Sequence, residues 1–166
     1  IPTFLHEANA FPGVTIKLLS KKADVVFLAF GEAKAHLPTE RPCVVVGNPV
    51  RQEFLTATRA EARKKLGLDD AFTIFSVGGS SGANAINKMA ADIMAWHCKE
   101  GKINHIHGYG KHGRENFPKM LEERGIDLND YPRIQAREYI DDMALWTAAA
   151  DLVVSRAGAI TISELE

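Results

Sequence analysis

Short apolar runs alternate along the chain with longer segments whose apolar residues recur at helical spacing. Such runs lie at 24–30, 43–46, 72–77 and 151–155, and strands are also predicted at the less apolar segments 1–5, 103–107 and 133–136. Continuous Val, Ile, Leu and Phe content is typical of strands buried on both faces, as in parallel sheets. Helices are predicted at 13–23, 59–66, about 83–100, about 114–124, 141–150 and from about 161. The sequence therefore predicts an α/β fold, with parallel sheets covered by helices on both faces.

The triplet Gly47-Asn48-Pro49 interrupts this alternation, because a residue before proline is disfavoured in a helix and Gly-Asn favours a turn. We predict a domain boundary here, with part of one domain at 1–46, a linker at 47–58 and a second domain at 59–166. The first residue is not Met, and the last predicted helix begins only a few residues before the end. We therefore expect the chain to be a fragment of a larger protein.

The charge balance argues against a nucleic-acid partner. The chain has 20 Lys and Arg residues and 21 Asp and Glu residues, for a formal net charge of −1, whereas a surface that neutralises many nucleic-acid phosphates normally has a large excess of Lys and Arg. The apolar runs are much shorter than the roughly 20 residues that span a bilayer. Cys43 and Cys98 lack the short paired spacings of a zinc site or disulfide framework and indicate reduced thiols.

The strongest candidate site is the segment Ser76-Val77-Gly78-Gly79-Ser80-Ser81-Gly82-Ala83, between a predicted strand and a long predicted helix. Glycines allow a ligand to approach the backbone, and the free N–H groups of a helix N-terminus favour an anion. Gly78, Gly79 and Gly82 therefore predict a phosphate loop, and a ligand-free turn is the alternative.

The same loop matches Gly-x-Ser-x-Gly, the nucleophile elbow of α/β-hydrolases, with Ser80 as the nucleophile. Such a hydrolase needs an acid and then a histidine after the serine. His97, His105, His107 and His112 all precede the plausible acids Asp141 and Asp142, so no triad can be written within the chain.

Two further patterns are weaker. The segment 108–113 is a literal Gly-x-Gly-x-x-Gly but lacks the acidic residue expected at a later strand end, so we interpret it as a flexible turn. His105 and His107 alternate on one strand face, with His112 nearby. Without a Cys or carboxylate beside them they are more typical of structural or surface residues, and we predict no metal site.

Four other polar segments follow predicted strands or the linker. Ser155–Glu164 forms a second strand–glycine–helix junction, in which Thr161 is the predicted helix cap and Glu164 a candidate acceptor for sugar hydroxyls. A helix is predicted after Ile140, with Asp141 as its N-cap. The backbone N–H and C=O of Ile140 could then face a planar ring of a ligand. Arg51, just after Gly47-Asn48-Pro49-Val50, has a fixed positive charge that could bind a diphosphate. His6-Glu7-Ala8-Asn9 places a base, a carboxylate and an amide on one loop, although turn and cap roles also explain such residues.

Five of these motifs, in this order and spacing, resemble the MurG family of N-acetylglucosaminyltransferases. The motifs are His6-Glu7-Ala8-Asn9, Gly47-Asn48-Pro49-Val50-Arg51, Gly78–Ala83, Tyr139–Met143 and Ser155–Glu164. The resemblance covers almost the whole chain and implies a glycosyltransferase-B architecture of Rossmann-like domains. Residues 1–46 would be the C-terminal part of the acceptor-side N-terminal domain, and 59–166 would form an incomplete donor domain.

The resemblance also implies site roles. Asn9 would contact the donor sugar, Arg51 and Ser80 the diphosphate, and the backbone of Ile140 the uracil edge. Glu164 would bind the ribose hydroxyls, and His6 and Glu7 would be candidate acid/base or positioning groups. The segment implied to line the phosphates and the sugar comprises Ala159, Ile160, Thr161, Ile162 and Ser163.

The implied reaction is an inverting transfer of N-acetylglucosamine from UDP-N-acetylglucosamine to the muramyl 4-hydroxyl of a lipid-linked muramoyl-pentapeptide, in peptidoglycan precursor synthesis. No cofactor or metal is implied. The implied location is the cytoplasmic face of the bacterial cell membrane, as a peripheral protein, with the membrane-contacting region upstream of the chain. We expect the fragment alone to be inactive. A serine hydrolase using Ser80, and a nucleotide-sugar epimerase or binding module, are the alternatives.

Overall fold

A computed structural model describes residues 1–166. The chain divides into two compact units. Unit 1 comprises Ile1–Arg51 together with Gly158–Glu166, and unit 2 comprises Gln52–Ala157. Each unit contains its own sheet, and every strand pairing in both sheets is parallel. The predicted parallel α/β class is therefore confirmed.

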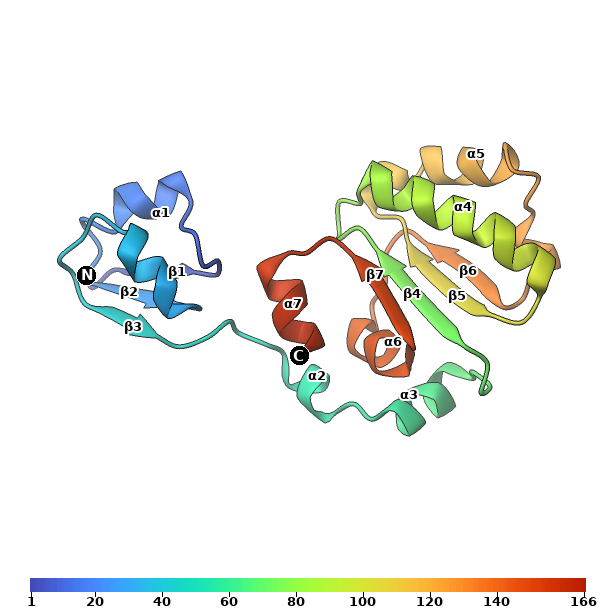
Figure 1. The fold of residues 1–166 in the computed structure, drawn as a ribbon, viewed down its shortest axis with the longest axis horizontal. Coiled ribbons are helices and arrows are strands. Elements are labelled where there is room, and N and C mark those ends of the chain that lie inside the picture. The colour runs from blue at the N-terminus through green and yellow to red at the C-terminus, as the bar shows by residue number, and fades with distance from the viewer. The chain divides into compact units, whose positions relative to one another are not determined.

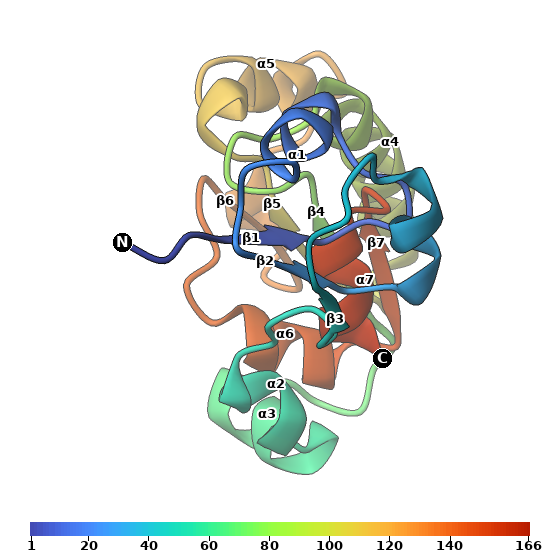
Figure 2. The ribbon, with the colours of Figure 1, turned by 90° about the vertical axis from the view of Figure 1, so that its left-hand side faces the viewer.

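Unit 1 is built around a three-stranded sheet in the order β1-β2-β3 (Figure 2). Its core is a cluster of small aliphatic side chains that includes Val26, Leu28 and Leu37. The strands are β1 (Phe4–Glu7), β2 (Val25–Leu28) and β3 (Cys43–Val45), and the helical segments are α1 (Val14–Leu19), the 3-10 helix η1 (Gly31–His36) and α7 (Ala159–Leu165).

Unit 2 contains a four-stranded sheet in the order β6-β5-β4-β7 (Figure 1). The strands are β4 (Thr73–Val77), β5 (Asn104–Gly108), β6 (Ile134–Arg137) and β7 (Leu152–Ser155). All five residues of β4 and of β5 are buried, as is usual for central strands of a parallel sheet. In β5 the buried residues include Asn104, His105 and His107, which no apolar pattern predicts. The carboxyl ends of all four strands therefore meet at one edge of the sheet.

Helices cover both faces of this sheet. On one face, α4 (Asn84–Glu100) and α5 (Asn116–Glu122) enclose a core that includes Met94, Phe117 and Leu121. On the other face, α6 (Met143–Ala149) packs Trp146 against Phe75 and Ile106, and α3 (Arg59–Leu66) packs on α6. The remaining helical segments are α2 (Gln52–Thr56), η2 (Lys111–Gly113) and η3 (Leu128–Asp130).

Three local predictions differ from the structure. Helix α2 forms inside the stretch expected to be linker, because no strong apolar periodicity marks five residues. Helix α7 begins at Ala159 with Gly158 as its N-cap, so Thr161 lies inside the helix and does not cap it. Asp142, not Asp141, occupies the N-cap position of α6, and its side chain makes no capping hydrogen bond.

A buried arginine ties the elements of unit 2 together. Arg63 on α3 donates to the Asp151 carboxylate at 2.7 Å and to the backbone oxygens of Ala149 and Asp69. Burial opposes ionisation of Asp151, but hydrogen bonds from Arg59 and the Thr73 N–H outweigh it and lower its pKa. This network holds α3 beside β7 and the start of β4.

Candidate functional site

The glycine loop at residues 78–83 joins the carboxyl end of β4 to the first turn of α4. A Cβ atom at Gly78 would lie 2.5 Å from the Ala83 backbone nitrogen, so only glycine permits this tight turn. Gly79 and Gly82 have φ values of 85° and 83°, in the left-handed region that favours glycine. No side chain caps α4, so its first-turn N–H groups are available to an anion.

The loop at 108–113 packs directly on this glycine loop, which corrects its interpretation as a flexible turn. A Cβ at Gly82 would lie 2.3 Å from the Tyr109 carbonyl oxygen, and one at Gly110 would lie 2.2 Å from the Gly82 nitrogen. The N–H groups of Lys111 and His112 donate to the carbonyl oxygens of Ser80 and Ser81 at 3.1 and 2.9 Å. The two glycine-rich loops therefore form one backbone-to-backbone interface.

Arg156 is a candidate that the sequence analysis left without a role. Because Ser155 pairs with Val77 in the sheet, the residue after β7 lies beside the residues after β4. An arginine nitrogen of Arg156 lies 3.0 Å from where a Cβ of Gly79 would stand. The sequence does place Arg156 directly after a predicted strand, which is a common position for ligand-binding residues. That this strand, β7, lies next to β4 is known only from the sheet order.

Ile140 lies at the same edge, after β6. Its side chain is buried and would lie 2.9 Å from a Cβ at Gly108. Its backbone N–H and C=O make no hydrogen bond within the chain, so they are free to pair with a ligand. The loop before it is fixed by the Gly110 N–H, which donates to the Glu138 carbonyl oxygen at 2.9 Å.

The interior of unit 2 contains a buried polar cluster close to these loops. The Ser76 hydroxyl lies 2.8 Å from both His105 Nε2 and His107 Nδ1. His107 Nε2 lies 3.1 Å from the Asn87 amide oxygen. Burial lowers the pKa of His107 to about 4 and, with repulsion from His97 and His107, that of His105 to about 3. Both imidazoles are therefore neutral at pH 7, in structural positions as the sequence analysis expected.

In unit 1, Glu7 organises the loop that follows β1. Its carboxylate accepts hydrogen bonds from the backbone and side-chain N–H groups of Asn9, each at 2.9 Å, and from the Gly13 N–H at 3.1 Å. Burial raises the pKa of Glu7, but these donors outweigh burial and the net pKa is lowered. Asn9 therefore has its amide nitrogen fixed and its carbonyl oxygen directed elsewhere.

His6 and Asn48 link this loop to the Gly47-Asn48-Pro49 segment. His6 Nε2 lies 3.0 Å from the Gly47 carbonyl oxygen, which can only accept, so Nε2 carries the proton. The Asn48 amide donates to the Ala8 carbonyl oxygen at 3.2 Å and to the Ser163 hydroxyl at 3.1 Å.

The remaining predicted residues of unit 1 gather on α7. The Glu164 carboxylate lies 3.9 Å from the Arg51 guanidinium, which brings together the residues assigned to ribose and diphosphate. The Ser163 hydroxyl also donates to the Ala159 carbonyl oxygen. Ile160 and Ile162 remain about two-fifths exposed.

The structure supports neither Ser80 as a nucleophile nor His105 and His107 as metal ligands. The imidazole hydrogen bonds of unit 2 involve Ser76 and Asn87, not Ser80, so the geometry does not favour a serine hydrolase. No group of three or more His, Cys, Asp or Glu side chains is arranged to hold a metal ion. No helix combines the length and apolar character needed to cross a membrane.

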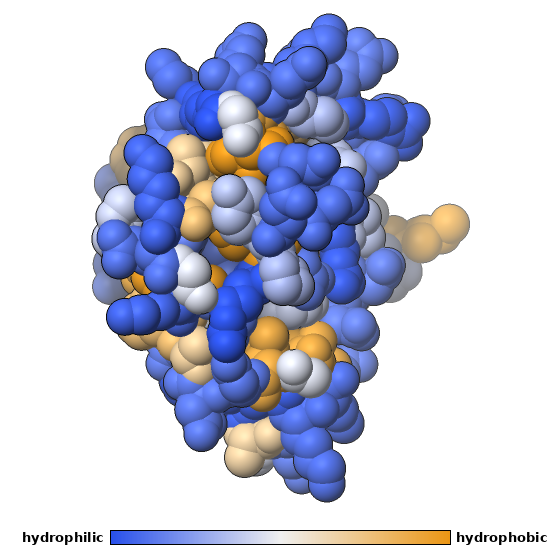
Figure 3. Space-filling model, turned by 90° about the vertical axis from the view of Figure 1, so that its right-hand side faces the viewer, coloured by the Kyte–Doolittle hydropathy of each residue, from blue (hydrophilic) through white to orange (hydrophobic).

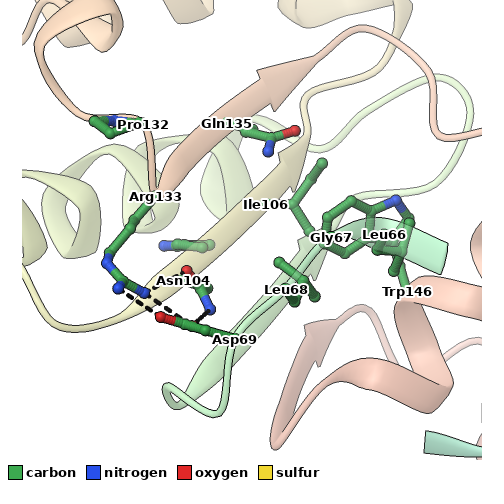
Figure 4. A pocket seen from close by; sticks show the side chains of 11 residues that line it. Leu66, Gly67, Leu68, Asp69, Asn104, Ile106, Pro132, Arg133, Gln135 and Trp146 are labelled. Carbon is green, nitrogen blue, oxygen red and sulfur yellow. Dashed lines mark hydrogen bonds and ion pairs between the residues drawn. The ribbon is translucent and has the colours of Figure 1, made fainter. Parts of the chain in front are cut away.

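A separate cavity of about 320 Å³ opens at the amino ends of the strands, away from the glycine loops (Figure 4). Arg133 and Asn104 both donate to Asp69 on one side, and Leu68, Ile106 and Trp146 form an apolar wall. Hydrogen bonds from Arg133 and Asn104 hold the pKa of Asp69 far below its usual value. The face at this edge is largely hydrophilic, with smaller hydrophobic areas (Figure 3).

A parallel α/β sheet with glycine loops converging at its carboxyl edge is the architecture of nucleotide-binding proteins. The sequence profile described as "Glycosyltransferase family 28 C-terminal domain" matches residues 73–166. The chain therefore belongs to glycosyltransferase family 28, through its C-terminal domain.

Relatives support this membership over nearly the whole chain. The UDP-N-acetylglucosamine–N-acetylmuramyl-(pentapeptide) pyrophosphoryl-undecaprenol N-acetylglucosamine transferase of Acetivibrio thermocellus is 43% identical over 166 residues, covering 99% of this chain and 44% of that protein. The enzyme of the same name from Desulforamulus reducens is 39% identical, covering 99% and 45%. The chain thus spans less than half the length of the curated relatives it matches.

Solved structures agree on the fold. The crystal structure of Acinetobacter baumannii MurG has a TM-score of 0.58 and 32% identity, covering 99% of this chain and 43% of that one. Anabaena HepE, in complex with UDP and glucose, has a TM-score of 0.52 at 17% identity, covering 92% and 45%. The second likeness concerns the fold alone.

Proposed function

We propose that the protein containing this chain transfers N-acetylglucosamine from UDP-N-acetylglucosamine to the muramyl 4-hydroxyl of an undecaprenyl-pyrophosphate-linked muramoyl-pentapeptide, with inversion at the anomeric carbon. The proposal is supported by the names of relatives 36–43% identical over the chain. This reaction would supply a peptidoglycan precursor and so serve cell wall biogenesis, cell shape and cell division.

The observation that carries the proposal is the glycine loop at 78–83. Its open backbone, the uncapped N-terminus of α4 and the adjacent Arg156 offer fixed positive charge to a diphosphate. In this proposal the departing UDP is stabilised by these groups and by Arg51, and Ser80 is a phosphate ligand and not a nucleophile.

The other donor contacts follow from the positions of the candidate residues. The free backbone N–H and C=O of Ile140 would form hydrogen bonds with the uracil edge. The Glu164 carboxylate would accept hydrogen bonds from the ribose hydroxyls in place of its present contact with Arg51. The first turns of α7 would face the phosphates and the sugar, through Ala159, Ile160, Thr161, Ile162 and Ser163. Asn9 would contact the sugar with its free carbonyl oxygen.

His6 is the better candidate for the acid/base role. Glu7 has a lowered pKa and three donors, so it is a weak base and suits the positioning of Asn9. His6 carries its proton on Nε2, which leaves Nδ1 unprotonated in the neutral imidazole and able to accept a proton from an acceptor hydroxyl.

We further propose that residues 1–46 belong to the acceptor-side domain, 47–58 to the linker and 59–166 to the donor domain. The lipid acceptor in the relatives' names implies work at a membrane surface, as a peripheral protein on the cytoplasmic face of the bacterial cell membrane. In this proposal the membrane-contacting region lies in sequence upstream of the chain.

Calorimetric titration of the full-length protein with UDP-N-acetylglucosamine tests the proposal. Glu164→Ala should weaken binding by about 1–3 kcal/mol, the usual scale for unpairing a buried polar group. Glu123→Ala, at an exposed position after α5, is the matched control and should bind like wild type. Absence of binding by the wild-type protein, together with labelling of Ser80 by an acylating probe, would instead support a hydrolase.

Conversion of the free nucleotide sugar without any lipid acceptor would support an epimerase. A transfer assay with a lipid-linked muramoyl-pentapeptide should give a disaccharide product only when both substrates are present.

A further inference from the structure

The buried polar cluster of unit 2 runs without interruption from the sheet interior to the paired glycine loops. Four hydrogen bonds connect its members: His105 Nε2 to Ser76 Oγ at 2.8 Å, Ser76 Oγ to His107 Nδ1 at 2.8 Å, His107 Nε2 to Asn87 Oδ1 at 3.1 Å, and Asn87 Nδ2 to the Tyr109 carbonyl oxygen at 3.0 Å. The four side chains are 0–3% exposed.

The chemistry of the last acceptor sets the direction of every bond. The Tyr109 carbonyl can only accept, so the Asn87 nitrogen donates to it and the Asn87 oxygen accepts from His107 Nε2. A neutral His107 then has an unprotonated Nδ1, which accepts a hydrogen bond from the Ser76 hydroxyl at 2.8 Å. The Ser76 carbonyl oxygen, 3.1 Å from the same nitrogen, would be its partner only in the other tautomer, because a carbonyl cannot donate. The Ser76 oxygen in turn accepts from His105 Nε2. This arrangement satisfies all four bonds of the chain, whereas a proton on His107 Nδ1 would satisfy the Ser76 carbonyl oxygen but leave His107 Nε2 facing the Asn87 oxygen with no hydrogen between them.

The chain ends where the two glycine loops meet. The Tyr109 oxygen that accepts from Asn87 also lies against Gly82, where an added Cβ would come within 2.3 Å of it. The following residues, Lys111 and His112, hold the carbonyls of Ser80 and Ser81. A shift of the Tyr109–Gly110 backbone would therefore displace the phosphate loop.

We propose that His107 and Asn87 are positioning residues for the diphosphate of the donor: through this ordered chain they fix the loop at 108–113, and that loop fixes the glycine loop at 78–83. Both side chains are buried, at 0% and 3% exposed, and would act through the loop backbone. The inference rests on the proposed function for the identity of the ligand. The positioning itself is a property of unit 2.

A neighbouring histidine provides the matched control. His97 on α4 is 1% exposed and lies against the His105 ring, with 5.3 Å between ring centroids. Neither of its ring nitrogens has a hydrogen-bond partner. Replacing His97 by Phe removes a buried imidazole from the same layer and leaves the chain of hydrogen bonds intact.

Three variants of the full-length protein test the proposal: His107→Phe, Asn87→Asp and the control His97→Phe. Asn87→Asp is nearly isosteric and still accepts from His107, but it cannot donate to the Tyr109 oxygen, so it tests the final link even if His107→Phe fails to fold. We expect the first two variants to raise the Kd and KM for UDP-N-acetylglucosamine about tenfold, because small misplacements of binding groups are costly. The KM for the lipid acceptor should stay within about twofold.

The double variant His107→Phe/Asn87→Asp should be no worse than the more affected single variant, because both residues act through the same link. Additive losses, or donor affinities equal to those of His97→Phe, would overturn the inference while leaving the proposed function in place. Failure of the wild-type protein to bind the nucleotide sugar would instead overturn the proposed function.

Hydrogen exchange tests the positioning without any ligand. The amides of Lys111 and His112 should exchange about tenfold faster in Asn87→Asp than in wild type, because their bonds to Ser80 and Ser81 open more often. His97→Phe should leave these two rates unchanged. Equal rates at these amides in Asn87→Asp and wild type would refute the inference, whatever the protein binds.

Discussion

The neutral buried histidines of β5 predict that unit 2 loses stability as the pH falls below 7. The pKa of His107 is lowered to about 4 and that of His105 to about 3, in both cases chiefly by burial. In the unfolded chain both would have pKa values near 6.5. The unfolded state therefore binds protons first as the pH falls, and stability present above about pH 6.5 is lost toward the folded-state values.

The magnitude follows from these values. By pH 5 each unfolded histidine is almost fully protonated, whereas its folded counterpart is still largely neutral, which lowers the free energy of unfolding by about 2 kcal/mol relative to pH 7. The two together should give a loss of about 4 kcal/mol. Burial also lowers the pKa of His97, which acts in the same direction. Carboxylates such as Glu7, with lowered pKa values, contribute mainly below this window.

Hydrogen exchange at the β5 amides of the full-length protein measures this loss, after correction for the intrinsic rate at each pH. The opening free energy should fall steeply from pH 7 to pH 5, and His107→Phe should remove about half of the slope. His36→Gln, an exposed residue of unit 1, should leave it unchanged. A flat profile in the wild-type protein, or an unaltered slope in His107→Phe, would show that the buried histidines do not set the pH dependence of unit 2.

Three substitutions give further expectations, each checked by urea unfolding. Gly82→Ala should destabilise unit 2 by about 2 kcal/mol or more and abolish donor binding, because its φ is positive and its Cβ would meet the Tyr109 oxygen; Gly101→Ala, with positive φ and open space, should cost only about 1 kcal/mol. Arg63→Met should cost about 2 kcal/mol, because the Ala149 and Asp69 carbonyl oxygens lose a charged donor while Arg59 and the Thr73 N–H still pair with Asp151. Arg114→Met, in an exposed pair, should cost less than about 1 kcal/mol. Glu7→Gln should destabilise unit 1 by about 1 kcal/mol, because its amide would face the Gly13 N–H; no loss would contradict the loop's dependence on the carboxylate.

Much of unit 2 could be predicted because local pattern determines it. The runs at 72–77 and 103–107 contain β4 and most of β5, and the long periodic segment contains α4. Gly67 and Gly101 end α3 and α4 in left-handed conformations, as glycines at helix ends commonly do. The glycines at 78, 79 and 82 predicted that other groups come close to the backbone there. In the structure these groups are the Ala83 nitrogen, the Arg156 side chain and the Tyr109 carbonyl oxygen.

The candidate site was less predictable wherever residues meet across strands. The segment 108–113 lacked the features of a dinucleotide fingerprint, yet it packs on Gly82 because β4 and β5 are neighbours in the sheet. Arg156 stayed without a role because its closeness to Gly79 depends on the pairing of β4 with β7. The start of α7 was misplaced by two residues, because Thr161 offered a stronger capping signal than Gly158.

The amino-acid sequence was enough to predict the parallel α/β class, the glycine loop at 78–83 and the family resemblance, because hydrophobic period, glycine content and motif order are properties of contiguous residues. The hydrogen bonds of Ser76 with His105 and His107 in the interior, and those of Asn87 with His107 and the Tyr109 carbonyl, are visible only in the folded chain. These contacts join residues 20 to 31 positions apart. Sheet register and helix packing bring them within hydrogen-bond distance, and no local pattern encodes either.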